Sequence, residues 1–157
     1  GHHRLVGAQA VELVQRIDGE LEAAARRVPA ALRGRSVYVE VGIGPTAAGA
    51  KSFIGETVAR LGLVNIVAGD AGLFPRVNPE MVVRRSPDLI IGPMATLAHV
   101  AERPAWSGMA ALRHQQVCQL DADRMDLLSR PGPRLGEAAH MLVDCLLALP
   151  PAPRQAR

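Results

Sequence analysis

The chain has 157 residues, the size of one ordinary domain and enough to bury a core without help from metals or disulfides. Apolar residues make up 48% and charged residues 21%, and no apolar run reaches the roughly 18 residues of a membrane span. The net charge is +3, but the arginines are scattered and aromatic residues make up only 3%, so the basic stripe and stacking side chains of a nucleic-acid-binding protein are missing. We therefore expect a single domain and no nucleic-acid partner.

The two ends of the chain are set apart from this domain. Residues 1–4, which open with Gly-His-His, look like the remnant of a purification tag, and the proline-rich residues 150–157 are expected to be a disordered tail. Residues 5–28 carry apolar side chains at intervals of three and four, which predicts a long amphipathic helix that Pro29 ends. The predicted domain occupies residues 35–149.

Strands and helices are predicted to alternate within this domain. Residues 37–41 are rich in β-branched side chains and predict the first strand, and a glycine-rich loop separates them from a helix over about residues 51–61. The other predicted strands lie at residues 64–69, 88–93 and 116–121, and the other predicted helices at residues 79–85, 95–102 and 135–149. This order predicts an α/β fold, a three-layer α/β/α sandwich with a mainly parallel sheet of about four strands.

Sandwiches of this kind bind ligands at the loops beyond the carboxyl ends of their strands. In this sequence the loops lie at residues 42–50, 69–78, 93–96 and 121–133. The last of them, residues 121–133, is predicted to be long and charged.

The loop after the first strand raises the question of a phosphate site. A phosphate-binding loop requires glycine, four residues, then glycine, lysine and serine or threonine in direct succession. Here Ala50 stands between Gly49 and Lys51, and one inserted helical residue turns the lysine by about 100°. A nucleotide-binding α/β domain that uses the degenerate loop Gly44–Ser52 is therefore the alternative to the function given below.

Residues typical of catalytic or metal centres are scattered. His99, His114 and His140 lie far apart, and no set of His, Asp and Glu has ligand spacing, so we expect no bound metal, no cofactor and no enzyme activity. Cys118 and Cys145 lie in apolar contexts, which favours two buried thiols, while a disulfide stays possible in an oxidising compartment.

Four segments, in order, resemble one protein family: residues 40–66, residues 74–91, the lone Trp106 and residues 120–146. Together they are similar to the C-terminal lobe of the periplasmic, class III, substrate-binding proteins of ABC importers for cobalamin, haem and iron-siderophores. The resemblance implies a periplasmic or lipid-anchored protein that captures a metal-containing small molecule and delivers it to a membrane permease. The long helix would then join two lobes. Because only one lobe is covered, the N-terminal lobe is missing, and the chain is either a fragment or a natural one-lobed protein.

The resemblance also implies positions for ligand contacts in the cleft between the lobes. Pro45 and Thr46 would line this cleft, and Phe74 matches an aromatic that packs on the ligand. Three further residues fall where family members contact the ligand, namely Asp123, Met125 and Arg130.

Glu80 matches the family's surface glutamate that docks to arginines of the permease. Several of these residues also have a reading that needs no family, and on composition alone the charged loop at residues 121–133 is expected to be solvated surface. A carboxylate such as Glu80 in a first helical turn is stabilising by about 0.3–1 kcal/mol on its own. Phe74 is equally compatible with core packing, and Trp106 is favoured as a structural anchor between a helix and a strand.

Overall fold

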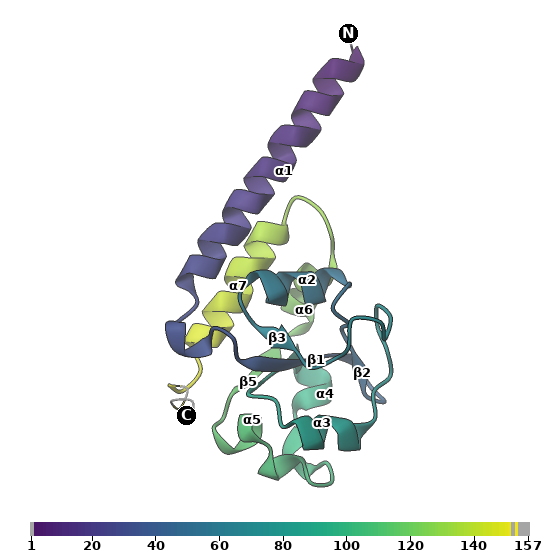
Figure 1. Ribbon diagram of the computed structural model, residues 1–157, viewed down its shortest axis with the longest axis vertical. Coiled ribbons are helices and arrows are strands. Elements are labelled where there is room, and N and C mark those ends of the chain that lie inside the picture. Colours follow the sequence, from purple (N-terminus) through teal and green to yellow (C-terminus); the bar gives the residue numbers. More distant parts are fainter. Residues whose placement is uncertain (1, 152, 154–157) are drawn as a thin grey trace.

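A five-stranded open sheet between two layers of helices organises the part of the chain that the structure describes (Figure 1). The structure is a computed structural model that describes residues 2–151 and 153, with the side chains of residues 2–6 outside its description. The strands are β1 (Ser36–Gly42), β2 (Thr46–Ala47), β3 (Val64–Asn65), β4 (Leu89–Pro93) and β5 (Val117–Leu120). The predicted three-layer α/β/α sandwich is confirmed, with one strand more than the expected four.

The sheet is parallel except at one edge. Its order is β2-β1-β4-β5, with β3 beside the start of β1, and β2 is the antiparallel strand. β3 is shorter than the predicted strand over residues 64–69 because Asn65 turns the chain. Its side-chain amide donates to Ala48 O at 3.0 Å, and its Oδ1 accepts from Val67 N at 3.0 Å.

The helices cover both faces of the sheet. Those on one face are α1 (His2–Arg27), α2 (Phe53–Arg60), α6 (Ala122–Ser129) and α7 (Leu135–Leu147), and those on the other are α3 (Pro79–Arg85), α4 (Met94–Leu97) and α5 (Ala110–Arg113) (Figure 1). The predicted helix over residues 95–102 divides into α4 and a 3₁₀ turn at Val100–Glu102, because His99 leaves the helical conformation. Another 3₁₀ turn follows at Trp106–Gly108.

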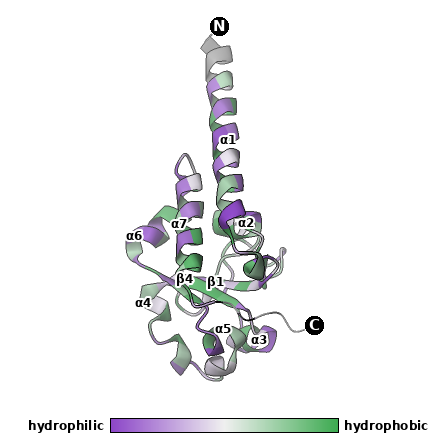
Figure 2. Cartoon of the chain, turned by 90° about the vertical axis from the view of Figure 1, so that its left-hand side faces the viewer, coloured by the Kyte–Doolittle hydropathy of each residue, from purple (hydrophilic) through white to green (hydrophobic). Residues whose placement is uncertain are grey.

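Two separate cores follow from the alternation of side chains along the strands. Val37 and Val39 of β1 point into the core beneath α1, α2, α6 and α7. Tyr38, between them, points into the opposite core, which contains Ile90 and Trp106. Figure 2 shows the resulting band of hydrophobic residues at β1 and β4 in the middle of the molecule.

The prediction of a long loop over residues 121–133 was wrong, because its first part forms α6. Asp121 caps this helix, with its Oδ1 accepting from Arg124 N at 2.9 Å. Leu128 is fully buried, and Met125 packs against the same core. The cap and the spacing of Met125 and Leu128 were present in the sequence, but the four charged residues between positions 121 and 128 made this segment look like a loop.

The predicted long helix is present as α1, and only its second half packs on the domain. Leu21 and Ala24 are buried against α7, and a Cβ on Gly136 of α7 would overlap Glu20, so the two helices are in close contact. The first half projects beyond the domain (Figure 1), with Val11 and Val14 exposed there. No described helix combines the length and the apolar character that crossing a membrane requires.

Cys118 and Cys145 form a disulfide between β5 and α7, with 6.0 Å between their Cα atoms. The interpretation that the sequence favoured, two buried thiols, was therefore wrong. At the ends of the chain, residue 1 of the predicted tag remnant and residues 152 and 154–157 of the predicted tail lie outside the described residues. Pro150 is described, and its carbonyl accepts from Gln116 Nε2 at 2.8 Å.

Candidate functional site

The loop at residues 69–78, here called the Phe74 loop, lies along the outer edge of β2. Ala47 N donates to Pro75 O at 2.9 Å, Gly49 N donates to Leu73 O at 2.8 Å, and Val77 N donates to Pro45 O at 3.0 Å. Phe74 is 52% exposed, so it is not a core residue. These bonds place its aromatic ring at the carboxyl edge of the sheet, where solvent or a ligand can reach it.

The glycines after β1 serve close packing. A Cβ on Gly49 would overlap the carbonyl oxygen of Gly72 in the Phe74 loop, and a Cβ on Gly55 would overlap the carbonyl oxygen of Gly49. Ser52 is the cap of α2, since its Oγ accepts from Gly55 N at 3.0 Å. The glycine-rich turn therefore exists to bring the Phe74 loop and α2 against β1.

The same contacts leave little for a phosphate to bind. The amides of Ala47 and Gly49 donate to the Phe74 loop, and Ala48 N donates to Val39 O at 2.9 Å. The Ser52 hydroxyl is buried and donates to Gly49 O at 2.8 Å. A phosphate-binding loop requires free amides that converge on the ligand, so the geometry does not favour the nucleotide alternative.

A first hollow, which we call the edge hollow, has a volume of about 440 Å³ and lies where β1 and β4 end. The loop after β1 contributes Ile43 and Pro45, α3 contributes Glu80, and the region after β4 contributes Thr96, Arg103 and Trp106. It therefore brings Pro45, predicted to contact the ligand, to the same hollow as Glu80, predicted to dock a partner.

Glu40 anchors the hydrogen-bond network beneath the edge hollow. Its side chain is fully buried and forms a bidentate ion pair with Arg103. Arg103 Nη1 donates to Oε1 at 2.7 Å, and Nη2 donates to Oε2 at 2.9 Å. Tyr38 OH donates to Oε1 at 2.9 Å, and Thr96 Oγ1 donates to Oε2 at 2.7 Å. Four donors thus offset the cost of burying this carboxylate.

The network changes the ionisation of its members and connects them to Trp106. Burial, followed by the negative charge of Glu40, raises the pKa of Tyr38 far above its usual value. The hydrogen bonds to Glu40 raise the pKa of Arg103. The Arg103 guanidinium lies 4.6 Å from the centre of the Trp106 ring, and Tyr38 meets that ring edge-on at 5.8 Å.

Trp106 is fully buried, so its predicted role as a structural anchor is confirmed. Its Nε1 atom, however, has no hydrogen-bond partner among the described residues. Buried polar atoms of this kind are uncommon, because leaving a donor unpaired costs free energy.

A second hollow, which we call the charged hollow, has a volume of about 940 Å³ and lies between α6 and α7. Asp123 and Arg130 are both exposed and both line it. Arg130 pairs with Asp126 at 2.9 Å, and Arg124 pairs with Asp121 at 2.5 Å. Most of the charge along α6 is therefore balanced locally.

The predicted ligand residues follow the carboxyl ends of the strands but do not share one hollow. Pro45 lines the edge hollow, whereas Asp123 and Arg130 line the charged hollow. Thr46 Oγ1 donates to Ile43 O at 3.1 Å, and Met125 packs partly against the core, so these side chains are engaged within the chain.

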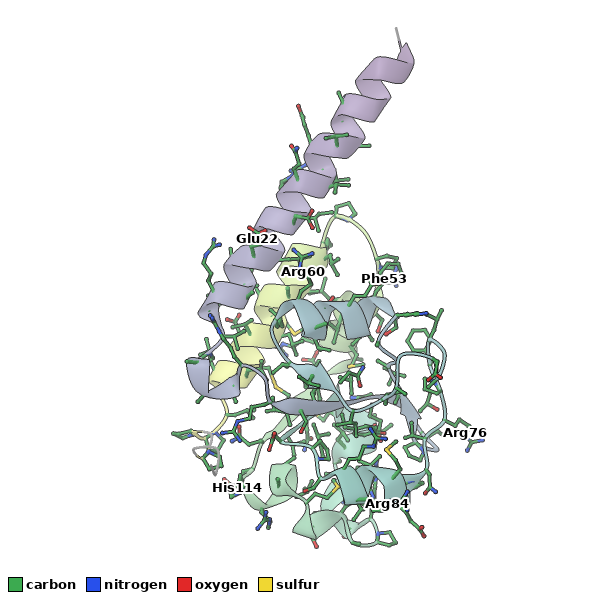
Figure 3. The ribbon with its side chains drawn as sticks, viewed as in Figure 1. Glu22, Phe53, Arg60, Arg76, Arg84 and His114 are labelled. Atoms are coloured by element: carbon green, nitrogen blue, oxygen red, sulfur yellow. A yellow bond between two sulfur atoms is a disulfide. The ribbon has the colours of Figure 1, made fainter. Side chains whose placement is uncertain are left out.

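Sequence reasoning missed several exposed apolar side chains at this edge. Ile43 is 82% exposed after β1, Leu73 precedes Phe74, Phe53 opens α2, and Met94 follows β4. Figure 3 shows Phe53 of α2, and Arg76 of the Phe74 loop, on the side of the molecule where β2 lies. Ile43, Phe53 and Met94 share one signal in the sequence, an apolar residue directly after a strand or at the start of a helix.

Sequence reasoning also missed Glu40, although an acidic residue inside an otherwise apolar strand indicates a buried partner. A metal centre finds no support in the part of the chain described here, where no three His, Cys, Asp or Glu side chains come together to hold an ion.

Comparison with known proteins places these features in a family context. A family model described as periplasmic binding protein matches residues 6–124. The uncharacterized ABC transporter substrate-binding lipoprotein YvrC of Bacillus subtilis is 30% identical over 115 residues, which are 71% of this chain and 35% of that protein.

Solved structures agree in fold. A possible iron-binding, periplasmic solute-binding protein of Staphylococcus epidermidis superposes with a TM-score of 0.74 at 24% identity, over 88% of this chain and 55% of that one. The periplasmic vitamin B12 binding protein BtuF of Vibrio cholerae gives 0.69 at 23% identity, over 90% and 54%. The periplasmic heme-binding protein RhuT of Roseiflexus gives 0.63 at 24% identity, over 88% and 58%. This chain thus covers little more than half the length of these structures.

Proposed function

Because the chain belongs to the periplasmic binding protein family, whose model matches residues 6–124, we propose that it forms the C-terminal lobe of a solute-binding protein for an ABC importer. In this role it captures a metal-containing small molecule, such as cobalamin, haem or an iron-siderophore, and delivers it to a membrane permease. It binds its solute without changing it and is not an enzyme. The continuous family match, from α1 into α6, is the observation that carries this proposal.

The surface at the carboxyl edge of the sheet suits a bulky solute with apolar parts. Ile43, Leu73, Phe74 and Met94 are all about half exposed or more at this edge. A solute enclosed between two lobes would cover them and gain hydrophobic stabilisation. One lobe offers only one wall, so tight binding requires an N-terminal lobe that closes over the solute.

The family works outside the cytoplasmic membrane, in the periplasm or anchored through a lipid, and so does this chain. The disulfide between Cys118 and Cys145 agrees with that location, because disulfides persist in oxidising compartments.

Glu80 supplies the contact to the permease in this proposal. It is exposed at the first turn of α3, and among the described residues its carboxylate takes part in no ion pair. A carboxylate on an exposed rim steers an oppositely charged partner and fixes its register. An arginine of the permease is the expected counterpart.

Calorimetric titration of a chain carrying both lobes tests the solute site. Cyanocobalamin, haemin and a ferric hydroxamate siderophore serve as probes. For the probe that binds, combining Phe74→Ala, Asp123→Asn and Arg130→Gln should weaken affinity at least about tenfold, because stacking and charged contacts are lost together.

The matched control is a triple variant on other surfaces that also removes one exposed apolar side chain, one negative charge and one positive charge: Val64→Ala, Glu22→Gln and Arg84→Gln. Figure 3 labels Glu22 on α1 and Arg84 on α3. Equal affinity of the two triple variants would refute the predicted site, and failure of all three solutes to bind would refute the solute class.

A further inference from the structure

The short helix α4 opens with Met94, one of the exposed apolar residues at the carboxyl edge of the sheet. We propose that Glu40, buried within β1, is a positioning residue for solute binding, because it holds α4 in the orientation that presents Met94 to the solute. The inference rests on the proposed function and adds to it a buried residue that acts on the solute without touching it.

Met94 lies at the centre of the carboxyl edge. β4 is flanked by β1 and β5, and Met94 directly follows β4. In the register of β4 and β5, Pro93 pairs with Leu120, so Met94 begins level with the start of α6. The loop after β1, which holds Pro45, and the first turn of α6, which holds Asp123, therefore flank it on either side. A solute that contacts both of these predicted residues would cover Met94 as well.

The side chain of Met94 suits this place. Of the five methionines, all of which the structure describes, it alone is exposed. An unbranched thioether adapts to irregular apolar surfaces, so it fits a bulky solute. A side chain this flexible binds best from a fixed backbone, because a mobile helix would lose further entropy when the solute orders it.

The helix α4 lacks the means to fix its own orientation. It has four residues, far fewer than the roughly 12 that an isolated helix needs, and no side chain caps its first turn. Leu97 is fully buried and anchors one face of the helix in the core. Hydrophobic burial is not directional, so this contact leaves the orientation of the helix open.

Thr96 supplies the directional contacts. Its hydroxyl donates to Glu40 Oε2 at 2.7 Å, whereas the competing acceptor Pro93 O lies at 3.4 Å. Its carbonyl accepts from Arg103 Nη2 at 2.9 Å, and the same nitrogen donates to Glu40 Oε2 at 2.9 Å, so the contacts close a ring. Both the side chain and the backbone of α4 are thus tied to one buried carboxylate through charge-assisted hydrogen bonds.

The buried charges are better explained by orientation than by stability. A buried ion pair is often no more stabilising than apolar side chains of the same volume, and its best-attested benefit is the selection of one arrangement. Apolar residues in place of Glu40 and Arg103 could fill the same space, but they could not bind the hydroxyl and the carbonyl of Thr96.

Hydrogen exchange of the ¹⁵N-labelled chain, followed by nuclear magnetic resonance, tests this hold on α4 without any solute. The Ala98 amide donates to Met94 O at 3.1 Å and reports on α4. The Ala148 amide donates to Asp144 O at 3.1 Å and serves as the reference at the end of α7.

Thr96→Val removes the hydroxyl and keeps the volume of the side chain, whereas a change at Glu40 would disturb four hydrogen bonds at once. It should speed exchange of the Ala98 amide at least about tenfold, because a lost bond to a charged group favours local opening by that factor. Thr96→Ser should stay within about threefold of the parent chain, since serine keeps the hydroxyl and loses only the β-branch. The Ala148 amide should not change in either variant.

Calorimetric titration of a chain carrying both lobes tests the consequence for binding. For whichever of cyanocobalamin, haemin and the ferric hydroxamate siderophore binds, Met94→Ala and Thr96→Val should each weaken affinity at least about fivefold, because an apolar contact is lost or misplaced. Leu147→Ala, at a similarly exposed residue outside both hollows, should leave the affinity unchanged. The double variant of Met94 and Thr96 should bind no more weakly than Met94→Ala alone, because Thr96 acts through Met94.

The two experiments separate this inference from the proposed function. Unchanged exchange of the Ala98 amide in Thr96→Val would show that Glu40 does not hold α4, and it would overturn the inference whatever binds. Additive losses in the double variant would overturn the action through Met94 and leave the solute site intact. If no probe binds the parent chain, the proposed solute class and its contact with Met94 are wrong, and the exchange result alone decides the hold on α4.

Discussion

Arg103 and Glu40 form a bidentate ion pair, with nitrogen-to-oxygen distances of 2.7 and 2.9 Å, although 63 residues separate them in the sequence. Gly92 of β4 makes room for this pair, because a Cβ at that position would lie 2.9 Å from Glu40 O and 3.1 Å from Glu40 Cβ. The wall of the edge hollow therefore depends on a residue from β1, a glycine from β4 and an arginine beyond α4.

Removal of Arg103 should destabilise the chain strongly. Arg103→Met leaves the fully buried Glu40 without its counter-charge, which typically costs about 3 kcal/mol when one partner of a buried pair is removed. Adding Glu40→Gln should recover at least about 1 kcal/mol, since the two residues are coupled. Urea unfolding measures both values. Additive losses in the double variant would show that the pair has no mutual stabilisation.

Tyr38 is the only tyrosine, so its ionisation can be followed by tyrosinate absorbance. Burial and Glu40 raise its pKa above the ordinary value of 10.0, while the unfolded chain keeps that value. The resulting stabilisation is complete below pH 10 and is lost as the pH rises above it toward the pKa of the folded state. We expect no tyrosinate in the folded protein above pH 10 until it unfolds. A normal titration with intact circular dichroism would contradict the buried network.

The disulfide should contribute substantially to stability. Cys118 and Cys145 are 27 residues apart, and closing a loop of that length raises the free energy of the unfolded chain by about 3.5 kcal/mol. The double variant Cys118→Ala and Cys145→Ala should lower the unfolding free energy by that amount in oxidising buffer. Its stability should not respond to dithiothreitol, whereas that of the parent chain should fall. Equal stabilities without reductant would show that the bridge is dispensable.

Three glycine-to-alanine changes should separate packing from backbone entropy. In Gly49→Ala and Gly55→Ala the new methyl group overlaps a backbone carbonyl, so each should destabilise by about 1–3 kcal/mol. Gly19 of α1 has open space around it, so Gly19→Ala should stabilise the helix by about 0.5–1 kcal/mol. Urea unfolding reports all three. Tolerance of alanine at Gly55 would contradict the close contact with Gly49.

The glycine-rich turn should not respond to nucleotides. Magnesium with ATP should leave the melting temperature unchanged, and Lys51→Ala should behave like the parent chain, because the amides of Ala47, Ala48 and Gly49 already donate to backbone carbonyls. Differential scanning fluorimetry measures both. A rise in melting temperature with ATP that Lys51→Ala abolishes would revive the nucleotide alternative.

Periodicity and turn residues predicted most of the fold. The strand at β1, the helix after Asn78 and the closing helix α7 all appear where apolar spacing and capping residues place them. The antiparallel strand β2 escaped prediction because its two residues are too few to show alternation. It exists through bonds to the distant Phe74 loop, and such long-range pairing leaves no local pattern.

The candidate site was less accessible to sequence reasoning. The family resemblance gave positions such as Pro45 and Arg130, but it could not show that they line different hollows. The Glu40 network depends on Thr96 and Arg103, which reach it only after the sheet has formed. Contacts across that many residues are consequences of topology, and a single sequence does not carry them.

The disulfide and α1 together have a mechanical consequence. The disulfide links α7 covalently to β5 of the central sheet, and α1 packs against α7 through Leu21 and Ala24. A rotation of the projecting half of α1 would therefore be transmitted to α7 by packing, and from α7 to β5 through the disulfide. The displacement of a spin label near the exposed Val14 should therefore report the rotation of the whole domain.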